Sequence, residues 1–191
     1  MAGGTALYFS YALRNINPGY HLVTAIAASE MNVVNKMVAD GIGVSVFPSA
    51  HTVYFENIYS HDLNHRQQRV LQRADPFTVE QLKNINAAVY HLGPLLAEDI
   101  PLSVIKLLAA KGKVSLDVQG YLRTVKNTNV LAIDWAEKRE ALPYIHFLKV
   151  NEYEMKVLTG ETDIEKAALL LNKWGAKEII ITLGSMGSVI Y

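Results

Sequence analysis

Strand and helix patterns alternate along this chain from residue 78 onward. Short apolar runs typical of buried strands lie at 87–92, 114–118, 147–150 and 178–183, with helical patterns between them. The last of these runs is almost continuously apolar, as central parallel strands are. The alternation predicts an α/β fold with a mainly parallel sheet and helices on both faces, in which ligands bind beyond the carboxyl ends of the strands.

Capping signals define the predicted ends of the helices in this part of the chain. Thr78-x-x-Gln81 and Thr162-x-x-Glu165 have the pattern of capping boxes that begin helices. Pro101 begins another helix, which Gly112 ends. One more helix is expected near 135–142, between two of the predicted strands.

The first 73 residues have a different organisation. Their predicted elements are a helix at 5–16 closed by the turn Asn17-Pro18-Gly19, a strand at 20–27, a helix at 31–38 that stops at Gly41, and a strand at 44–47. From 51 to 73 the sequence is extended and mostly polar, which predicts a hairpin with its turn at 62–65. A sheet with so few apolar residues is not expected to lie in the core; we expect it to cover another part of the protein.

The charge balance limits the kind of partner that this chain can have. Its 18 basic and 18 acidic side chains cancel, so no net field draws it to nucleic acid or to a membrane, and small molecules are the expected partners. It has no cysteine, which excludes disulfides and thiolate metal sites. It shows neither an apolar run of about 18 residues nor the pattern of a signal peptide. We therefore expect a cytoplasmic protein.

Two segments that follow strands carry candidate functional residues. Asn151 and Glu154 are three residues apart at the start of a predicted helix, which places both side chains on one face. In a purely structural interpretation they form a capping box. In a functional one, the amide and the carboxylate organise Mg²⁺ and phosphate oxygens, with the carboxylate acting through water. The pattern leaves both interpretations open.

The second segment is a glycine turn between two predicted strands. Thr182, Gly184 and Gly187 form the pattern Thr-x-Gly-x-x-Gly. Backbone N–H groups at such a turn can hold a phosphate because glycine allows close approach and unusual dihedral angles. An ordinary hairpin turn explains the same pattern. It is neither a Walker loop nor a dinucleotide fingerprint, because no helix follows it.

Together, in this order, the two segments resemble the PfkB/ribokinase family of small-molecule kinases. The resemblance implies a ribokinase-like fold with a small β lid, Asn151 and Glu154 in the Mg²⁺ and phosphate region, and Thr182, Gly184 and Gly187 against the nucleotide phosphates. ATP and Mg²⁺ are the implied cofactors, with Glu154 reaching the metal through water.

Further segments are similar to the same family, so that the resemblance covers nearly the whole chain. The pair Gly3-Gly4 before a helix is like the family's substrate-binding glycines. The mostly polar hairpin lies where the family has its β lid, which we expect at residues 43–73. The segments His91-Leu-Gly-Pro94 and Leu116 to Arg123 look like strand ends beside the substrate cleft. The substrate-binding residues implied in this way are Gly3, Gly4, Asp117, Gln119 and Arg123.

The resemblance also implies two elements that we do not find in these residues. Family members begin with a strand that carries an acidic substrate-binding residue, and they have a glycine-rich G-A-G-D segment whose aspartate is the catalytic base. No G-x-G-D occurs in the 191 residues, so the base is unassigned. We therefore expect one incomplete ribokinase-like domain over residues 1–191, with little or no activity as given.

The expected function is transfer of the γ-phosphoryl group of ATP to a hydroxyl of a sugar, polyol or nucleoside. Phosphoryl transfer depends mainly on positioning and charge neutralisation, which the residues above would supply. The alternative is a non-catalytic protein of the same fold that binds a ligand or a partner. Exposed sheet edges invite pairing with a second copy, so we expect a homodimer formed through the lid or the sheet edge.

Overall fold

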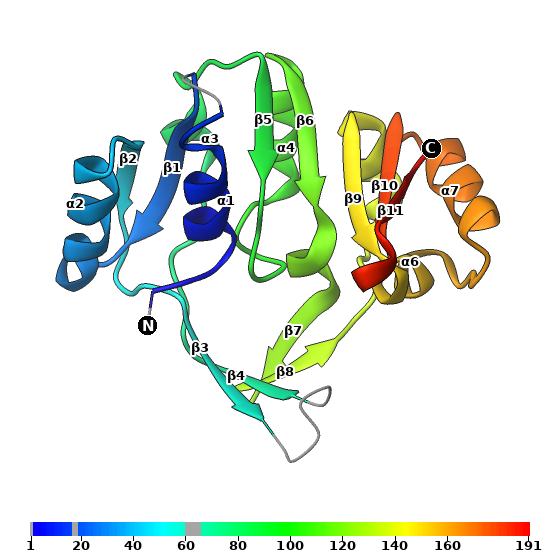
Figure 1. The fold of residues 1–191 in the computed structure, drawn as a ribbon, viewed down its shortest axis with the longest axis horizontal. Coiled ribbons are helices and arrows are strands. Elements are labelled where there is room, and N and C mark those ends of the chain that lie inside the picture. Colours follow the sequence, from blue (N-terminus) through cyan, green and yellow to red (C-terminus); the bar gives the residue numbers. More distant parts are fainter. Residues whose placement is uncertain (1, 17–18, 60–65) are drawn as a thin grey trace. The chain divides into compact units, whose positions relative to one another are not determined.

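The computed structural model describes residues 2–16, 19–59 and 66–191 (Figure 1). It divides into two compact units, of which the first comprises residues 1–76 and 125–131 and the second residues 77–124 and 132–191. The turns expected at residues 17–18 and 62–65 lie outside the described residues. Among the described residues, no helix has the length and apolar character needed to cross a membrane.

The first unit begins with alternating helices and strands. They are α1 (Thr5–Leu13), β1 (His21–Ile26), the 3-10 turn η1 (Ala28–Glu30), α2 (Met31–Ala39) and β2 (Gly43–Pro48). The two strands pair in parallel, and Leu22, Met37 and Ile42 form a small buried cluster beside them. Each of the four elements predicted in this region is therefore present. Gly41 has a φ of 86°, a left-handed conformation that explains why the chain leaves α2 there.

A four-stranded sheet contains the predicted hairpin. Its strands are β3 (Tyr54–Tyr59), β4 (Arg66–Gln72), β7 (Arg123–Lys126) and β8 (Asn129–Ala132), in the order β3-β4-β8-β7. The antiparallel pairing of β3 with β4 confirms the hairpin. The sequence did not predict β7 and β8, and β2, at the start of the segment 43–73, pairs with β1 instead of with this sheet. The boundaries 43–73 for a lid stay a prediction.

The second unit is built on a five-stranded sheet. Its strands are β5 (Val89–Leu92), β6 (Lys113–Asp117), β9 (Phe147–Asn151), β10 (Glu178–Thr182) and β11 (Ser188–Ile190). The order is β11-β10-β9-β6-β5, in which the last four strands are parallel and β11 returns antiparallel to β10. The predicted parallel sheet is therefore confirmed, together with all four of its predicted strands.

Helices of the second unit pack against this sheet, and most begin where the sequence predicts. They are α3 (Val79–Leu82), α4 (Leu102–Ala109), α5 (Lys138–Ala141) followed by the 3-10 turn η3 (Leu142–Tyr144), α6 (Glu152–Thr159) and α7 (Ile164–Lys173). The capping box of Thr78 and Gln81 is present. The capping box predicted at Thr162 is wrong, because Asp163 caps α7 by accepting the N–H of Lys166 at 2.9 Å.

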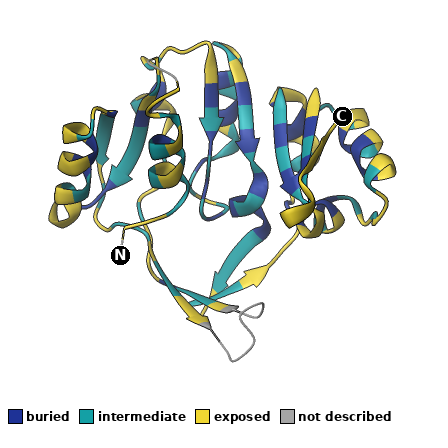
Figure 2. Cartoon of the chain, in the orientation of Figure 1, coloured by how far each residue is buried: buried dark blue, intermediate teal, exposed yellow. Residues whose placement is uncertain are grey.

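Alternate residues of the parallel strands face the core. The alternation is visible as dark and light bands along β5, β6, β9 and β10 in Figure 2. The residues of the buried set are Tyr90, Leu92, Val114, Leu116, Leu148, Val150, Ile179 and Ile181. The residues between them are half-buried or exposed, and they are largely polar at the carboxyl ends of β6 and β9. One face of the sheet thus stabilises the fold, while the other holds the candidate site.

Candidate active site

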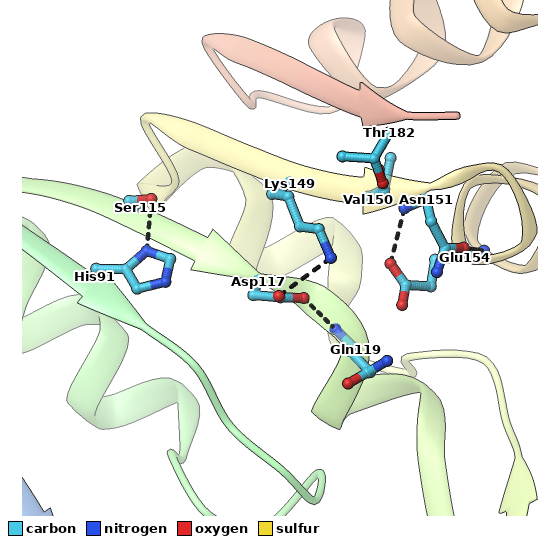
Figure 3. A network of polar contacts seen from close by, with 9 residues as sticks. All are labelled: His91, Ser115, Asp117, Gln119, Lys149, Val150, Asn151, Glu154 and Thr182. Carbon is cyan, nitrogen blue, oxygen red and sulfur yellow. Dashed lines mark hydrogen bonds and ion pairs between the residues drawn. The ribbon is translucent and has the colours of Figure 1, made fainter. Parts of the chain in front are cut away.

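The carboxyl ends of β6, β9 and β10 bring the candidate residues of the second unit to one edge of the sheet (Figure 3). The register pairs Asp117 of β6 with Lys149 of β9, and Asn151 of β9 with Thr182 of β10. Gly184 follows β10 directly, in the short turn η4 (Gly184–Met186). Asp117, Asn151 and Gly184 therefore share the carboxyl-terminal edge of the sheet, where the sequence predicts ligand binding.

An ion pair connects the two central strands at this edge. The Lys149 Nζ lies 3.1 Å from Asp117 Oδ2, with 32% and 20% of the two side chains exposed. The other carboxylate oxygen of Asp117 accepts the N–H of Gln119 at 3.3 Å and so caps the 3-10 turn η2 (Val118–Leu122). Both oxygens of Asp117 are thus engaged. The lysine, which sequence alone could not assign, projects into the polar cluster.

The two segments predicted to lie beside a substrate cleft contact each other. A Cβ atom on Gly120 would collide with the backbone of Pro94, so the chain needs glycine there for close approach. On neighbouring strands, His91 Nδ1 lies 3.0 Å from Ser115 Oγ. Burial lowers the pKa of His91, and the ammonium of Lys149 acts in the same direction against the opposing effect of Asp117.

The capping-box interpretation of Asn151 and Glu154 is confirmed. The N–H of Glu154 donates to Asn151 Oδ1 and the N–H of Asn151 donates to Glu154 Oε2, each at 2.8 Å. Unusually for a cap on a surface helix, the glutamate is only 4% exposed. Burial raises the pKa of Glu154, while the N–H of Asn151 and the charge of Lys149 partly oppose that rise. Whether the pair also organises phosphate and metal stays a prediction.

The raised pKa of Glu154 predicts a pH-dependent stability that a Glu154→Gln variant should lack. Because the folded-state pKa lies above the unfolded value, the glutamate favours folding most below its unfolded pKa and loses that contribution as pH rises through the folded pKa. The glutamine can still accept the N–H of Asn151. Urea unfolding between pH 4 and 7 should show the variant gaining stability relative to the parent as pH rises. A difference that is constant with pH would contradict this expectation.

The glycine turn after β10 has the geometry that a phosphate would need. Gly184 has a φ of 56° and Gly187 a φ of 95°, and a Cβ atom on either would meet no atom within 4 Å. Glycine is thus required by the dihedral angles, and the space above the turn is open. Within the described part of the chain, the N–H groups of Gly184 and Ser185 have no hydrogen-bond acceptor. The Thr182 hydroxyl lies beside them and donates to Val150 O at 3.4 Å.

The other predicted residues lie around this cluster or in the first unit. Arg123 begins β7 directly after η2, close enough for its charge to lower the pKa of Glu154. Gly4 is the residue before α1, with a φ of 87°, so the glycine pair does lead into a helix as predicted. Gly3 and Gly4 belong to the first unit and the remaining candidates to the second.

The sequence family agrees with this arrangement. The profile described as "pfkB family carbohydrate kinase" matches residues 57–191, which include the glycine turn and the capping box. The chain belongs to this family. As a PfkB protein it is, at the level of the family, a sugar or nucleoside kinase of the ribokinase type, and therefore a phosphotransferase.

Relatives of this PfkB chain include a kinase of known substrate and several solved structures. A cytidine kinase of Thermococcus kodakarensis is 29% identical over 199 residues, which cover all of this chain and 68% of that protein. A pyrophosphate-dependent kinase in the ribokinase family, solved as a sulfate complex, is 27% identical with a TM-score of 0.89, over 100% of this chain and 68% of the other.

A ribokinase of Thermotoga maritima matches with a TM-score of 0.68 at 19% identity, over 99% of this chain and 62% of that one. The PfkB chain thus spans about two thirds of the length of these proteins. The ribokinase-like α/β fold expected from the sequence is confirmed.

The residues at the edge suit a magnesium ion that is held mainly by phosphate oxygens and water. One oxygen of Glu154 accepts the N–H of Asn151, and the other has no hydrogen-bond donor among the described residues. The described residues contain no group of three side chains that could cage a metal. A single carboxylate oxygen at this edge fits Mg²⁺, which usually keeps several waters and is held by few protein groups.

Proposed function

We propose that the edge formed by β6, β9 and β10 binds a phosphate donor beside a polyhydroxy acceptor, and that the reaction is transfer of the γ-phosphoryl group of ATP to an acceptor hydroxyl. The observation that carries this proposal is the glycine turn after Thr182. Among the described residues the N–H groups of Gly184 and Ser185 have no acceptor, and a Cβ on Gly184 or Gly187 would meet open space. The ammonium of Lys149 lies at the same carboxyl edge of the sheet (Figure 3), and a phosphate could accept from both kinds of donor.

The residues divide into two groups in this proposal. On the donor side, Thr182, Gly184 and Gly187 contact phosphate oxygens and Lys149 neutralises their charge. Mg²⁺, positioned by Glu154 through water, would neutralise the donor further when bound. On the acceptor side, the proposed ligands of the hydroxyl groups are Asp117, Gln119 and Arg123. A substrate-binding role for Gly3 and Gly4 stays what the resemblance implies.

Asp117 needs no proton transfer to act on the acceptor side. Its carboxylate is held by Lys149 and by the N–H of Gln119, so it can accept a hydrogen bond from a substrate hydroxyl in a fixed orientation. We assign no base, because no G-x-G-D segment occurs in the 191 residues. We therefore propose that the chain as given binds its ligands but transfers phosphoryl groups slowly or not at all.

Pyrophosphate is a second candidate donor. Three of the structural neighbours are pyrophosphate-dependent kinases, at 26–27% identity, whereas the neighbour solved with ribose and ATP, a ribokinase of Arabidopsis thaliana, is 21% identical. The donor-side residues named here would contact phosphate alone, and a pyrophosphate has the same phosphate oxygens as the end of ATP. Both donors therefore belong in the test.

Calorimetric titration of the purified chain with ATP and with pyrophosphate, each with Mg²⁺, tests donor binding. A panel of cytidine, inosine, ribose and myo-inositol then tests transfer. We expect saturable binding of at least one donor and turnover far below the roughly 1–100 s⁻¹ of kinases. Turnover in that range would contradict the proposed inactivity, whereas no binding of either donor would contradict the donor site and favour the non-catalytic alternative.

We further propose that the protein is cytoplasmic and associates with a second copy. Exposed apolar side chains occur on the four-stranded sheet of the first unit, at Tyr54, Ile58, Leu71 and Leu131. Others occur on the edge strand β11, at Val189 and Ile190. Such surfaces favour pairing. Light scattering at high concentration should therefore give a mass above the 21.2 kDa of one chain, and a clean monomer would contradict the association.

A further inference from the structure

A pocket lies at the edge of the sheet opposite to the candidate active site, in the second unit. It has a volume of about 460 Å³ and is formed where β6, β9 and β10 begin. These strands run away from it toward the candidate active site, as the arrows of β6 and β9 in Figure 1 show. Its size falls within the range of small-molecule sites, which is about 300–1,000 Å³.

The pocket is lined by basic groups and by no acidic residue. Lys111, Lys113 and Lys177 line it together with His146. The Nζ of Lys111 donates to the carbonyls of Lys83 and Ile85 at 2.6 and 2.5 Å, which holds this ammonium in place without neutralising it. Within the described ranges, neither Lys113 nor Lys177 has a carboxylate within ion-pair distance. Three lysines and a histidine thus line one small volume.

One acidic side chain contacts the lining histidine weakly. Glu178 Oε1 is 3.9 Å from His146 Nε2, a weak contact that is an ion pair only when the imidazole is protonated. The neighbouring Lys106 is already paired with Glu140 at 2.6 Å, so that carboxylate is occupied. The local charge remains positive although the whole chain is neutral. A concentration of one sign of charge in a concave site attracts small ions of the opposite sign.

Aromatic groups form part of the walls. Tyr144 lines the pocket, and the ring of Phe147, edge-on to His146 at 4.6 Å, lies beneath the ammonium of Lys113 at 5.7 Å. The Phe147 ring therefore lies under the Lys113 ammonium, and the Lys106 ammonium lies 5.7 Å from the centroid of the Tyr144 ring. The five-residue strands of the sheet separate this pocket from the candidate active site by roughly 15 Å, at about 3.3 Å per residue.

We propose that this pocket binds a small phosphorylated molecule at a site separate from the candidate active site. The three ammonium groups require an anion with several oxygens, and the aromatic wall accommodates an organic body next to them. The site does not depend on the function proposed above. It uses none of the residues assigned to the donor or the acceptor.

Pyrophosphate is the probe for a direct test by NMR of the ¹⁵N-labelled chain, at constant ionic strength. We expect saturable shifts of the amides of Gly112, His146 and Lys177, both in the parent and in a Lys149→Gln variant. The double variant Lys113→Gln/Lys177→Gln should bind at this pocket at least tenfold more weakly. The double variant Lys166→Gln/Lys173→Gln removes two exposed lysines of α7 instead, and it should bind as the parent does.

Three results would overturn the proposal. These are shifts confined to the edge that carries Asn151 and Gly184, equal shifts of the pocket amides with chloride, and equal weakening in both double variants. If the pocket double variant is unstable, the single Lys177→Gln variant replaces it, because this exposed side chain makes no contact within the described ranges that the fold would lose. A loss of pocket shifts in that variant alone supports the site, and their persistence at the parent's affinity contradicts it.

Discussion

Replacing Lys149 by glutamine is expected to weaken binding of a phosphate donor by about ten- to a hundredfold. Lys149 lies two residues before Asn151 near the carboxyl end of β9, at the same edge of the sheet as the glycine turn. A hydrogen bond to a charged group contributes about 1.5–3 kcal/mol, and each 1.4 kcal/mol is a tenfold change in affinity. Calorimetric titration with pyrophosphate or ATP in the presence of Mg²⁺ measures the effect.

Two further variants show whether Lys149 contacts the phosphate donor directly or affects donor binding only by positioning Asp117. Asp117→Asn removes the ion pair but keeps the ammonium, so donor affinity should stay the same or rise. Lys173→Gln removes an exposed lysine of α7 and should leave donor affinity unchanged. If Lys149→Gln binds the donor as tightly as the parent, or if Asp117→Asn weakens donor binding as strongly, the lysine only positions Asp117.

A Leu148→Ala variant is expected to lose about 2–5 kcal/mol of its free energy of unfolding. Leu148 is the second residue of β9, has no exposed surface, and pairs with Leu116 of β6 on one side and Ile179 of β10 on the other. Truncation removes apolar contacts and leaves a cavity that a close-packed sheet cannot fill. The loss is a large fraction of the 5–15 kcal/mol typical of whole domains, and urea unfolding followed by circular dichroism measures it.

The matched control is Leu169→Ala on α7. This leucine is 47% exposed, so its truncation should change the free energy of unfolding by about 0.5 kcal/mol or less. Equal losses in the two variants would mean that β9 does not lie at the centre of a tightly packed core. The expected order of the two effects does not depend on any assumption about function.

The parallel sheet could be predicted because its strands carry an unmistakable signal. Ile179 and Ile181 belong to an apolar run that is bounded by Gly175 and Gly184. The run is too short for a helix, so the sequence favours a strand there. Since parallel strands place their carboxyl ends together, Asp117 and Asn151 could be expected at one edge without any coordinates.

The misses have equally specific causes. Thr162 and Asp163 can both cap a helix, and only the backbone geometry decides which side chain reaches the third N–H group of α7. The hairpin of β7 and β8 was missed because its turn contains no glycine. Asn127 and Thr128 adopt φ angles of 47° and 70°, which are uncommon for residues that have a Cβ atom.

Within the site, the sequence could name residues but not their partners. Lys149 alternates with Leu148 and Val150, which indicates its face, yet its pairing with Asp117 depends on β6 lying beside β9. The sequence order of the strands does not fix that neighbour. His91 and Ser115 occupy the same half-buried positions of β5 and β6, a signal of period two that could have identified them.

The alternation of buried and site-facing residues along β9 limits how this strand can change in evolution. Lys149 and Asn151 lie on the face of the candidate site, whereas Leu148 and Val150 are buried in the core, so that the two sets alternate along the strand. Inserting or deleting one residue would turn every side chain beyond that point to the opposite face of the sheet. Polar residues of β9 would then enter the apolar layer, and its apolar residues would face the candidate site. Point substitutions could therefore retune the site independently of the core, but a change of length within the strand would destroy both at once. Variation in length among homologous chains should accordingly be confined to the connections outside β9.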